Sequence, residues 1–247
     1  QKVEFSEDSQ LISIGEFAFS KSSIERINIP KKCEHIEEGA FFECILLEMV
    51  EFHPNSKLQI IEERTFSKTS LKSIQMPKHI KTIGKDAFSN CNLLINIDFN
   101  ENSELGLIGE QSFMNTPLIE IKIPDHVKQI GRKAFYNCRC LTNVELSKNS
   151  ELISIEDYSF YYTSISSIFI PSKTKYIQYK AFIRCEKLEN ITIGSKSELY
   201  YIGNCAFFYN TSIKKFKVPA NVQFIEKDSF DGYNLELEYE ENSKFRF

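Results

Sequence analysis

The chain has 247 residues, of which 42% are hydrophobic and 26% charged, and it carries a formal net charge of −4. This is the composition of an ordinary globular protein. It lacks the concentrated basic charge that nucleic-acid binding requires, and no apolar run approaches the ~18–20 residues of a membrane span. We therefore expect no nucleic-acid partner and no membrane span in this chain.

Phenylalanine is unusually frequent and proline is regularly spaced. Phenylalanine occurs 21 times, whereas tryptophan is absent. Pro30, Pro77, Pro124 and Pro171 stand 47 residues apart, and Pro219 follows after 48. Four cysteines step by the same 47 residues, namely Cys44, Cys91, Cys138 and Cys185. Such a fixed period is the mark of a repeat architecture, and here each period contains two similar coils of 23 or 24 residues.

The two kinds of coil alternate along the chain. The first kind is illustrated by residues 58–77 and recurs at 11–30, 105–124, 152–171 and 199–219. The second kind is illustrated by residues 80–99 and recurs from Cys33, Val127 and Thr174, and more loosely from Val222. This makes ten coils, and their length lies within the ~20–29 residues of leucine-rich repeats.

Each coil predicts one short strand followed by a return path. Apolar residues alternate with polar ones in the strand, as in Ile27 and Ile29, which is the period of a half-buried strand. Proline ends most first-kind strands because it has no N–H to donate. An Ala-Phe or Ser-Phe pair lies midway along the return path, where the ring fills the core (Ala40-Phe41, Ala134-Phe135, Ala181-Phe182).

A single coil cannot bury these faces, so stability requires stacking. We expect residues 1–247 to form one leucine-rich-repeat solenoid domain, with a parallel β-sheet on one face and short helical turns or loops on the other. The chain opens at Val3-Glu4-Phe5 as if within a strand, and Asn242-Ser243-Lys244-Phe245 resembles the start of a further coil. We therefore expect a fragment truncated within a repeat at both ends.

The coil pattern resembles the BspA-like leucine-rich-repeat family. Residues 80–91 and 127–138 match that pattern most closely, with Ile-Gly-x-x-Ala-Phe-x-x-Cys in both. The resemblance covers the whole chain, and the alternation of cysteine coils with Ser/Thr coils is similar to protozoan members. It implies a surface or secreted protein that adheres to host cells or matrix proteins, with a protein or glycan partner.

The cysteines occupy one column of the repeat. Intervening coils place other small polar residues in that column: Ser22, Thr69, Thr116, Thr163 and Asn210. Successive cysteines two coils apart are separated by ~10 Å, beyond the roughly 7 Å Cα limit for a disulfide. We therefore expect them to pack against the turn backbone. Cys33 is predicted to lie in the core, and Cys205 to lie near solvent.

No pattern of a catalytic or metal site occurs. The histidines (His35, His53, His79 and His126) show no ligand spacing, and there is no nucleophile elbow, phosphate loop or dinucleotide fingerprint. We expect no enzyme activity, no metal and no cofactor. Two glycosylation sequons begin at Asn190 and Asn210, of which Asn210 falls in the cysteine column.

The outward positions of the strands form a polar face with one exception. Asn143, Glu145 and Asn190 are typical members, whereas Phe169 is aromatic. An exposed ring there would resemble an interface anchor. The alternative is a ring that lies along its neighbours.

Aromatic side chains also gather in the C-terminal half. Eight of the eleven tyrosines fall between Tyr158 and Tyr209. One column of the repeat contains Tyr176, Tyr201 and Phe224, and another contains Tyr136, Tyr161, Ile183 and Phe208. Neighbouring coils bring such side chains within ~5 Å. These ladders predict a partner-binding strip away from the strand face; the alternative is that they shield the stack.

Three functions remain from the sequence. The first is an adhesin-like recognition module at the cell surface or secreted. The second is a cytoplasmic scaffold or regulatory recognition domain, favoured by the unpaired cysteines. The third, an enzyme, would need an active site outside this sequence.

Overall fold

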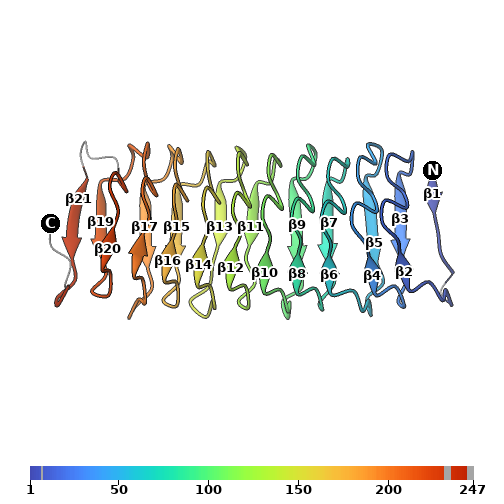
Figure 1. The fold of residues 1–247 in the computed structure, drawn as a ribbon, viewed down its shortest axis with the longest axis horizontal. Helices are drawn as coiled ribbons and strands as arrows, with labels where there is room; N and C mark the ends of the chain where they lie inside the picture. Colours follow the sequence, from blue (N-terminus) through green and yellow to red (C-terminus); the bar gives the residue numbers. More distant parts are fainter. Residues whose placement is uncertain (7, 231–234, 244–247) are drawn as a thin grey trace.

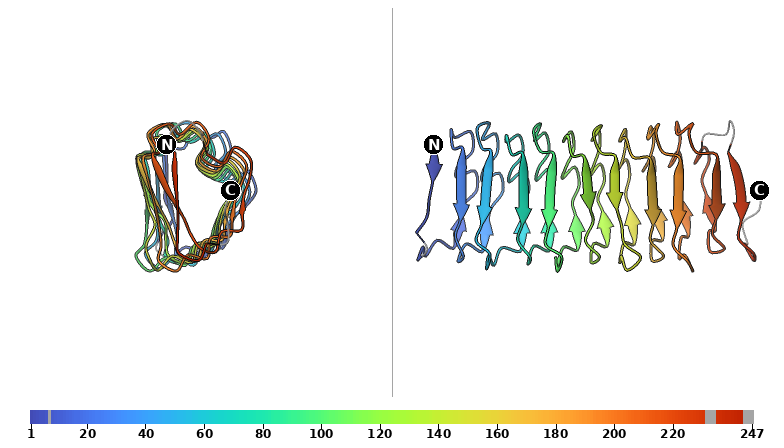
Figure 2. Two further views of the ribbon diagram at one scale, coloured as in Figure 1. Left: turned by 90° about the vertical axis from the view of Figure 1, so that its left-hand side faces the viewer. Right: turned by 180° about the vertical axis from the view of Figure 1, so that it is seen from behind.

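The computed structural model describes residues 1–6, 8–230 and 235–243 and shows a rod of stacked coils (Figure 1). The rod contains about ten coils, about 23 residues apart. Seen along the axis, the coils superimpose on one closed outline (Figure 2). The predicted solenoid is therefore confirmed. The further coil expected after Asn242 lies outside the described residues from Lys244 onward.

The predicted strands form one side of the rod, and neighbouring strands run parallel. Their inward side chains, such as Ile27 and Ile29, are buried, and the residues between them face outward. The strands are β1 (Lys2–Val3), β3 (Arg26–Ile29), β5 (Met49–Phe52), β7 (Ser73–Met76), β9 (Asn96–Phe99), β11 (Glu120–Lys122), β13 (Asn143–Glu145), β15 (Ser167–Ile170), β17 (Asn190–Ile193), β19 (Lys215–Val218) and β21 (Glu236–Tyr239).

This long-strand side is not one continuous ladder. From β7 onward its strands pair as doublets, β7–β9, β11–β13, β15–β17 and β19–β21. In the second strand of a doublet, the residue after the strand donates its N–H to the first strand, as Gly194 does to Ile170 at 2.9 Å and Glu240 to Val218 at 3.0 Å. The corresponding residue of a first strand is proline, which has no N–H. The proline columns thus separate each doublet from the one before.

A second ladder lies on the return path and was not predicted. It is built of two-residue strands, eight of which pair continuously from β6 to β20. They are β2 (Ser13–Ile14), β4 (His35–Ile36), β6 (Ile60–Ile61), β8 (Thr82–Ile83), β10 (Leu107–Ile108), β12 (Gln129–Ile130), β14 (Ser154–Ile155), β16 (Tyr176–Ile177), β18 (Tyr201–Ile202) and β20 (Phe224–Ile225).

The turns that follow these short strands are not helical among the described residues, so of the expected short helical turns or loops the structure has loops. Most coils place two residues four apart at positive φ, for example Asp86 at 55° and Asn90 at 58°. A helix needs a run of consecutive residues in the right-handed conformation, and the two residues at positive φ interrupt such a run. The N–H groups of residues 86, 88 and 90 donate to the next coil, and those of 87, 89 and 91 donate three residues back. We call this corner of the rod, which in each coil is the turn after the short strand (residues 84–91 in the coil of Asp86), the turn ridge.

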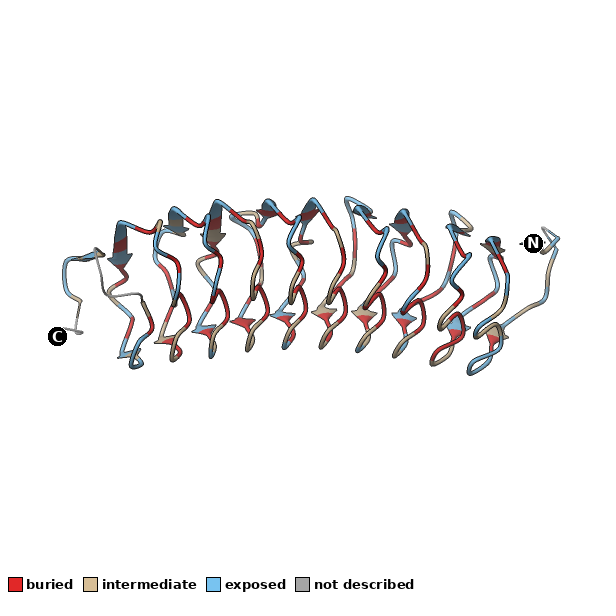
Figure 3. Ribbon diagram, turned by 90° about the horizontal axis from the view of Figure 1, so that it is seen from above, coloured by how far each residue is buried: buried red, intermediate tan, exposed pale blue. Residues whose placement is uncertain are grey.

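Phenylalanine fills the core beneath the turn ridge, as predicted from the Ala/Ser-Phe pairs. Ten rings stack from one coil to the next, with centroids 5.1–5.4 Å apart. They are Phe19, Phe41, Phe66, Phe88, Phe113, Phe135, Phe160, Phe182, Phe207 and Phe230. Viewed from above, every coil between the two ends of the rod contains buried residues (Figure 3). The ladder therefore runs the length of one continuous core.

Three successive coils carry glycine at one corner, where their backbones approach each other closely. A Cβ atom on Gly131 would lie 2.7 Å from the carbonyl carbon of Gly109, and one on Gly109 would lie 2.5 Å from the carbonyl oxygen of Ile83. Real Cβ atoms do not approach backbone this closely. Gly84, Gly109 and Gly131 thus let three successive coils approach each other at this corner.

Candidate binding surface

The long-strand face is a solvated polar surface. Asn143, Glu145 and Asn190 are all exposed, and the Glu145 carboxylate lies 3.7 Å from the Lys122 ammonium. Phe169 is only half-buried, stands opposite Thr192 in the register and packs against the core. The structure thus places the ring along its neighbours, without bringing it to other aromatic side chains.

The short-strand side carries the first aromatic column. Tyr176, Tyr201 and Phe224 are register partners on β16, β18 and β20. Their rings do not contact one another directly. Tyr200 instead contacts Tyr176 at 6.4 Å and Phe224 at 5.3 Å between ring centroids. Tyr201 is half-buried beside Glu226, and burial is the main cause that raises its pKa.

The second aromatic column lies on the turn ridge. Tyr136 and Tyr161 stack with centroids 4.4 Å apart and an interplanar angle of 10°. Ile183 is buried and interrupts the column. Beyond it, Phe208 contacts Tyr209 rather than a ring of the same column. The column therefore forms one stacked pair, not a strip of four.

Three further tyrosines, which the sequence interpretation did not single out, join this pair. Tyr158 contacts Tyr161 at 6.1 Å and Tyr179 at 5.3 Å, and Tyr162 contacts Tyr161 at 6.0 Å. We call Tyr136, Tyr158, Tyr161, Tyr162 and Tyr179 the tyrosine cluster. Tyr158 and Tyr162 stand at positive φ, and alignment of the turn columns would have revealed them.

Cations lie over the rings of this region. The Lys133 ammonium is 5.5 Å from the Tyr136 centroid, and the Arg139 guanidinium is 4.5 Å from that of Tyr162. Such contacts are attractive because the face of the ring is electron-rich.

Lys180 has the most extensive contact with the cluster. Its ammonium lies 4.8 Å from the Tyr179 centroid and 5.6 Å from that of Tyr158. A hydrogen bond between the Lys180 and Tyr179 side chains raises the pKa of Lys180 and lowers the pKa of Tyr179. The cluster is therefore both aromatic and positively charged.

The cysteine column is structural, as expected. The Cys91 thiol donates to the Phe66 carbonyl at 3.0 Å, and the Thr69 hydroxyl donates to the same oxygen at 2.9 Å. Burial raises the pKa of Cys91 to about 11 and those of Cys138 and Cys185 to about 12. None of the seven cysteines is in a disulfide among the described residues.

The exposed thiol differs from the predicted one. Cys140 is exposed, whereas Cys205 is half-buried, and Cys33 lies in the core as predicted. Second-kind coils have one residue more than the first four first-kind coils between the cysteine column and the next core leucine or isoleucine. Cys140 occupies part of that insertion on the outer surface.

The remaining polar residues form no metal cluster in the part of the chain that the structure describes. His79 and Glu104 pair at 2.8 Å, in a column two coils from His126 and Glu151. The Asn210 side chain is buried and donates to the Phe182 carbonyl at 2.8 Å, whereas Asn190 is exposed. Among the described residues, no helix has the length and apolar character needed to cross a membrane.

Solved structures of leucine-rich-repeat proteins match most of this chain at low sequence identity. A leucine-rich-repeat protein from Eubacterium ventriosum is 17% identical over 96% of this chain and 72% of its own, with a TM-score of 0.53. A leucine-rich cell surface protein from Faecalibacterium prausnitzii is 19% identical over 94% of this chain and 79% of its own, with a TM-score of 0.46. The pneumococcal vaccine antigen PcpA is 18% identical over 97% of this chain and 80% of its own, with a TM-score of 0.41. No curated protein matches the sequence.

A family model agrees with the repeat pattern. The model of the BspA-type leucine-rich repeat region matches residues 1–105 and 106–236, which include both kinds of coil and nearly the whole rod. The resemblance seen in the coil pattern is thereby confirmed. The chain belongs to the BspA-type leucine-rich-repeat family.

Proposed function

We propose that this chain is a recognition module whose tyrosine cluster anchors a protein partner, and that it serves adhesion to host cells or matrix at the cell surface. The family and the repeat fold support protein–protein recognition, because stacked repeats present an extended surface. The family's surface-protein neighbours support the location.

The tyrosine cluster is the observation that carries this proposal. Tyrosine is enriched in protein interfaces because its ring offers a large rigid contact area with a polar end. Five tyrosine rings contact one another on adjacent coils, and none of the five is fully buried. The phenylalanine ladder already fills the core beneath them. The cluster is therefore available to a partner.

The test is binding of labelled domain to cultured mucosal epithelial cells and to basement-membrane extract. Substitution of an anchoring tyrosine typically costs ~2 kcal/mol or more, which is about thirtyfold in affinity. The double variant Tyr158→Ala/Tyr161→Ala should therefore bind at least tenfold more weakly. Tyr161→Ala alone should weaken binding to a smaller extent. Tyr201→Ala tests in the same way whether the short-strand column contributes.

Phe42→Ala is the matched control. Phe42 occupies the same column as Tyr161 five coils away, is half-buried and lies outside the cluster. It should bind as the parent does, and circular dichroism should show all variants folded. Equal binding by the parent and the tyrosine variants, or no binding to either target, would contradict the proposal.

An intracellular scaffold is the alternative that the cysteines favour. All seven are free, and free cysteines in this number are more usual in reducing compartments. The reading frame around this chain separates the two functions, because an export signal or a surface anchor would exclude the scaffold.

A further inference from the structure

Four cations lie beside the tyrosine cluster on the turn ridge, although the whole chain has a net charge of −4. Lys133, Arg139, Lys180 and Arg184 lie over tyrosine rings at 4.5–5.6 Å. Within residues 1–6, 8–230 and 235–243, none of these four has a carboxylate within ion-pair distance. Their charge is therefore not neutralised inside the protein.

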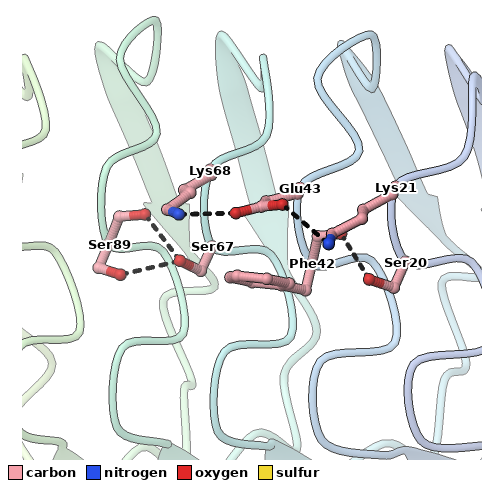
Figure 4. A network of polar contacts seen from close by, with 7 residues as sticks. All are labelled: Ser20, Lys21, Phe42, Glu43, Ser67, Lys68 and Ser89. Atoms are coloured by element: carbon pink, nitrogen blue, oxygen red, sulfur yellow. Dashed lines mark hydrogen bonds and ion pairs between the residues drawn. The ribbon is translucent and has the colours of Figure 1, made fainter.

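The N-terminal half of the same ridge is arranged differently. Lys68 also lies over a ring, that of Phe42 at 5.2 Å, but its ammonium is 2.6 Å from the Glu43 carboxylate. Lys21 approaches the other oxygen of that carboxylate at 3.7 Å (Figure 4). Lys21, Lys68 and Arg184 occupy the same column of the repeat. The column thus carries paired cations in the first coils and an unpaired one beside the cluster.

A surface pocket of about 180 Å³ lies where this charge gathers. Arg139, Arg184 and Lys187 line it together with Tyr162, and Glu186 forms part of its wall. The Arg139 guanidinium is held in place on two sides, by the Tyr162 ring and by a 2.7 Å hydrogen bond that its Nε donates to the side-chain Oδ1 of Asn137. A guanidinium presents paired N–H groups that match a carboxylate, and stacking on a ring leaves that edge free.

We propose that this pocket binds a carboxylate of the partner, so that the module recognises an acidic polypeptide segment lying across the tyrosine cluster. This inference rests on the proposed function and adds the chemistry of the partner. The pocket has room for one side chain. Glu186 in its wall repels a continuous polyanion, whereas it can accept a hydrogen bond from the backbone of a peptide. A discrete acidic side chain therefore fits better than a sulfated polysaccharide.

The test uses surface plasmon resonance with three immobilised probes: a ten-residue peptide of alternating Glu and Gly, the matching Gln–Gly peptide, and heparin. The parent domain should bind the Glu–Gly peptide, and at least tenfold more weakly the Gln–Gly peptide. Arg139→Gln/Arg184→Gln should lose at least tenfold for the Glu–Gly peptide. Lys21→Gln/Lys68→Gln removes the same net charge from paired cations and should bind as the parent does.

Three results would overturn the inference. The first is that the parent domain binds the Glu–Gly and Gln–Gly peptides equally well. The second is that both double variants lose the same affinity for the Glu–Gly peptide, which would indicate unspecific charge attraction. The third is tighter binding of heparin than of the Glu–Gly peptide, with the same dependence on the two arginines, which assigns the pocket to a glycan. If cell or matrix binding depends on Tyr158 and Tyr161 but not on the arginines, the proposed function stands and this inference fails.

Discussion

The phenylalanine ladder predicts a graded loss of stability along the rod. Phe135 is fully buried in a central coil, with Phe113 at 5.4 Å on one side and Phe160 at 5.2 Å on the other. Truncation of a buried phenylalanine to alanine costs ~3–5 kcal/mol, and each stacked neighbour adds ~0.5–1.5 kcal/mol beyond simple burial. With two neighbours, Phe135→Ala should fall at the upper end of that range, about 4–5 kcal/mol.

The first ring of the ladder provides the comparison. Phe19 is half-buried and has a stacked neighbour on one side, Phe41 at 5.3 Å. Phe19→Ala should therefore lower the free energy of unfolding by about 2 kcal/mol, roughly half the burial value for a core ring. Phe135→Leu, which keeps most of the volume but not the ring, should cost about 1–2 kcal/mol and so separates filling from stacking.

The assay is urea unfolding followed by far-ultraviolet circular dichroism, with the slope checked for loss of cooperativity, to which repeat arrays are prone. Equal losses for Phe19→Ala and Phe135→Ala would refute the argument that stacking along the ladder determines the cost. A Phe135→Leu variant as unstable as Phe135→Ala would show that the cavity does not matter.

Three further predictions concern the thiols, the close-packed glycines and the turn ridge. With Ellman's reagent at pH 8, Cys140 should react at once and the five cysteines buried in the core only after unfolding; early reaction of more than two thiols would contradict the buried column. Gly131→Ala should cost ~1–3 kcal/mol in urea unfolding because its Cβ meets backbone, whereas Gly106→Ala, with its nearest neighbour at 3.8 Å, should be near neutral. The hydrogen bond from Lys68 lowers the pKa of Glu43, so the stability that this pair contributes is present above pH 4.5 and is lost as the pH falls through the lowered pKa. Lys68→Gln should raise the pKa of Glu43 toward 4.5, measured by carboxyl NMR, and an unchanged pKa would contradict the pairing.

The coil pattern predicted the features that repeat in every coil. The strand alternation, the core rings and the small polar column all have one-dimensional signals, because each coil supplies the same residue type at the same step. Cys91 illustrates this: its place between threonine-bearing coils could be read from spacing alone, and the structure adds the shared Phe66 carbonyl.

The second ladder had no such signal. A strand of two residues, such as His35–Ile36, is too short to show alternation. It forms because the neighbouring coil presents backbone hydrogen-bonding groups in register with it. This pairing depends on how the coils stack and leaves no pattern in the sequence of a single coil. Positive φ at Asp86 and Asn90 likewise accompanies hydrogen bonds between coils, so the sequence left helical turns and loops open, and the described residues form loops.

The candidate surface was predicted only in part. Column alignment found the Tyr136–Tyr161 stack, because both rings project from equivalent turns. It placed Tyr201 correctly in the register with Tyr176, but not the Tyr200 ring that actually contacts Tyr176. A column gives the position of the Cα atom, whereas the direction of a long side chain depends on its neighbours.

The two sides of the rod differ in how they transmit load. On the short-strand side, eight strands from β6 to β20 are linked without a break. On the long-strand side, strand pairing is interrupted every two coils from β7 onward, which is a spacing of ~10 Å. Under bending, the continuous ladder on the short-strand side therefore resists extension, whereas the long-strand side can open between its doublets. The rod should bend by widening these interruptions on the long-strand side.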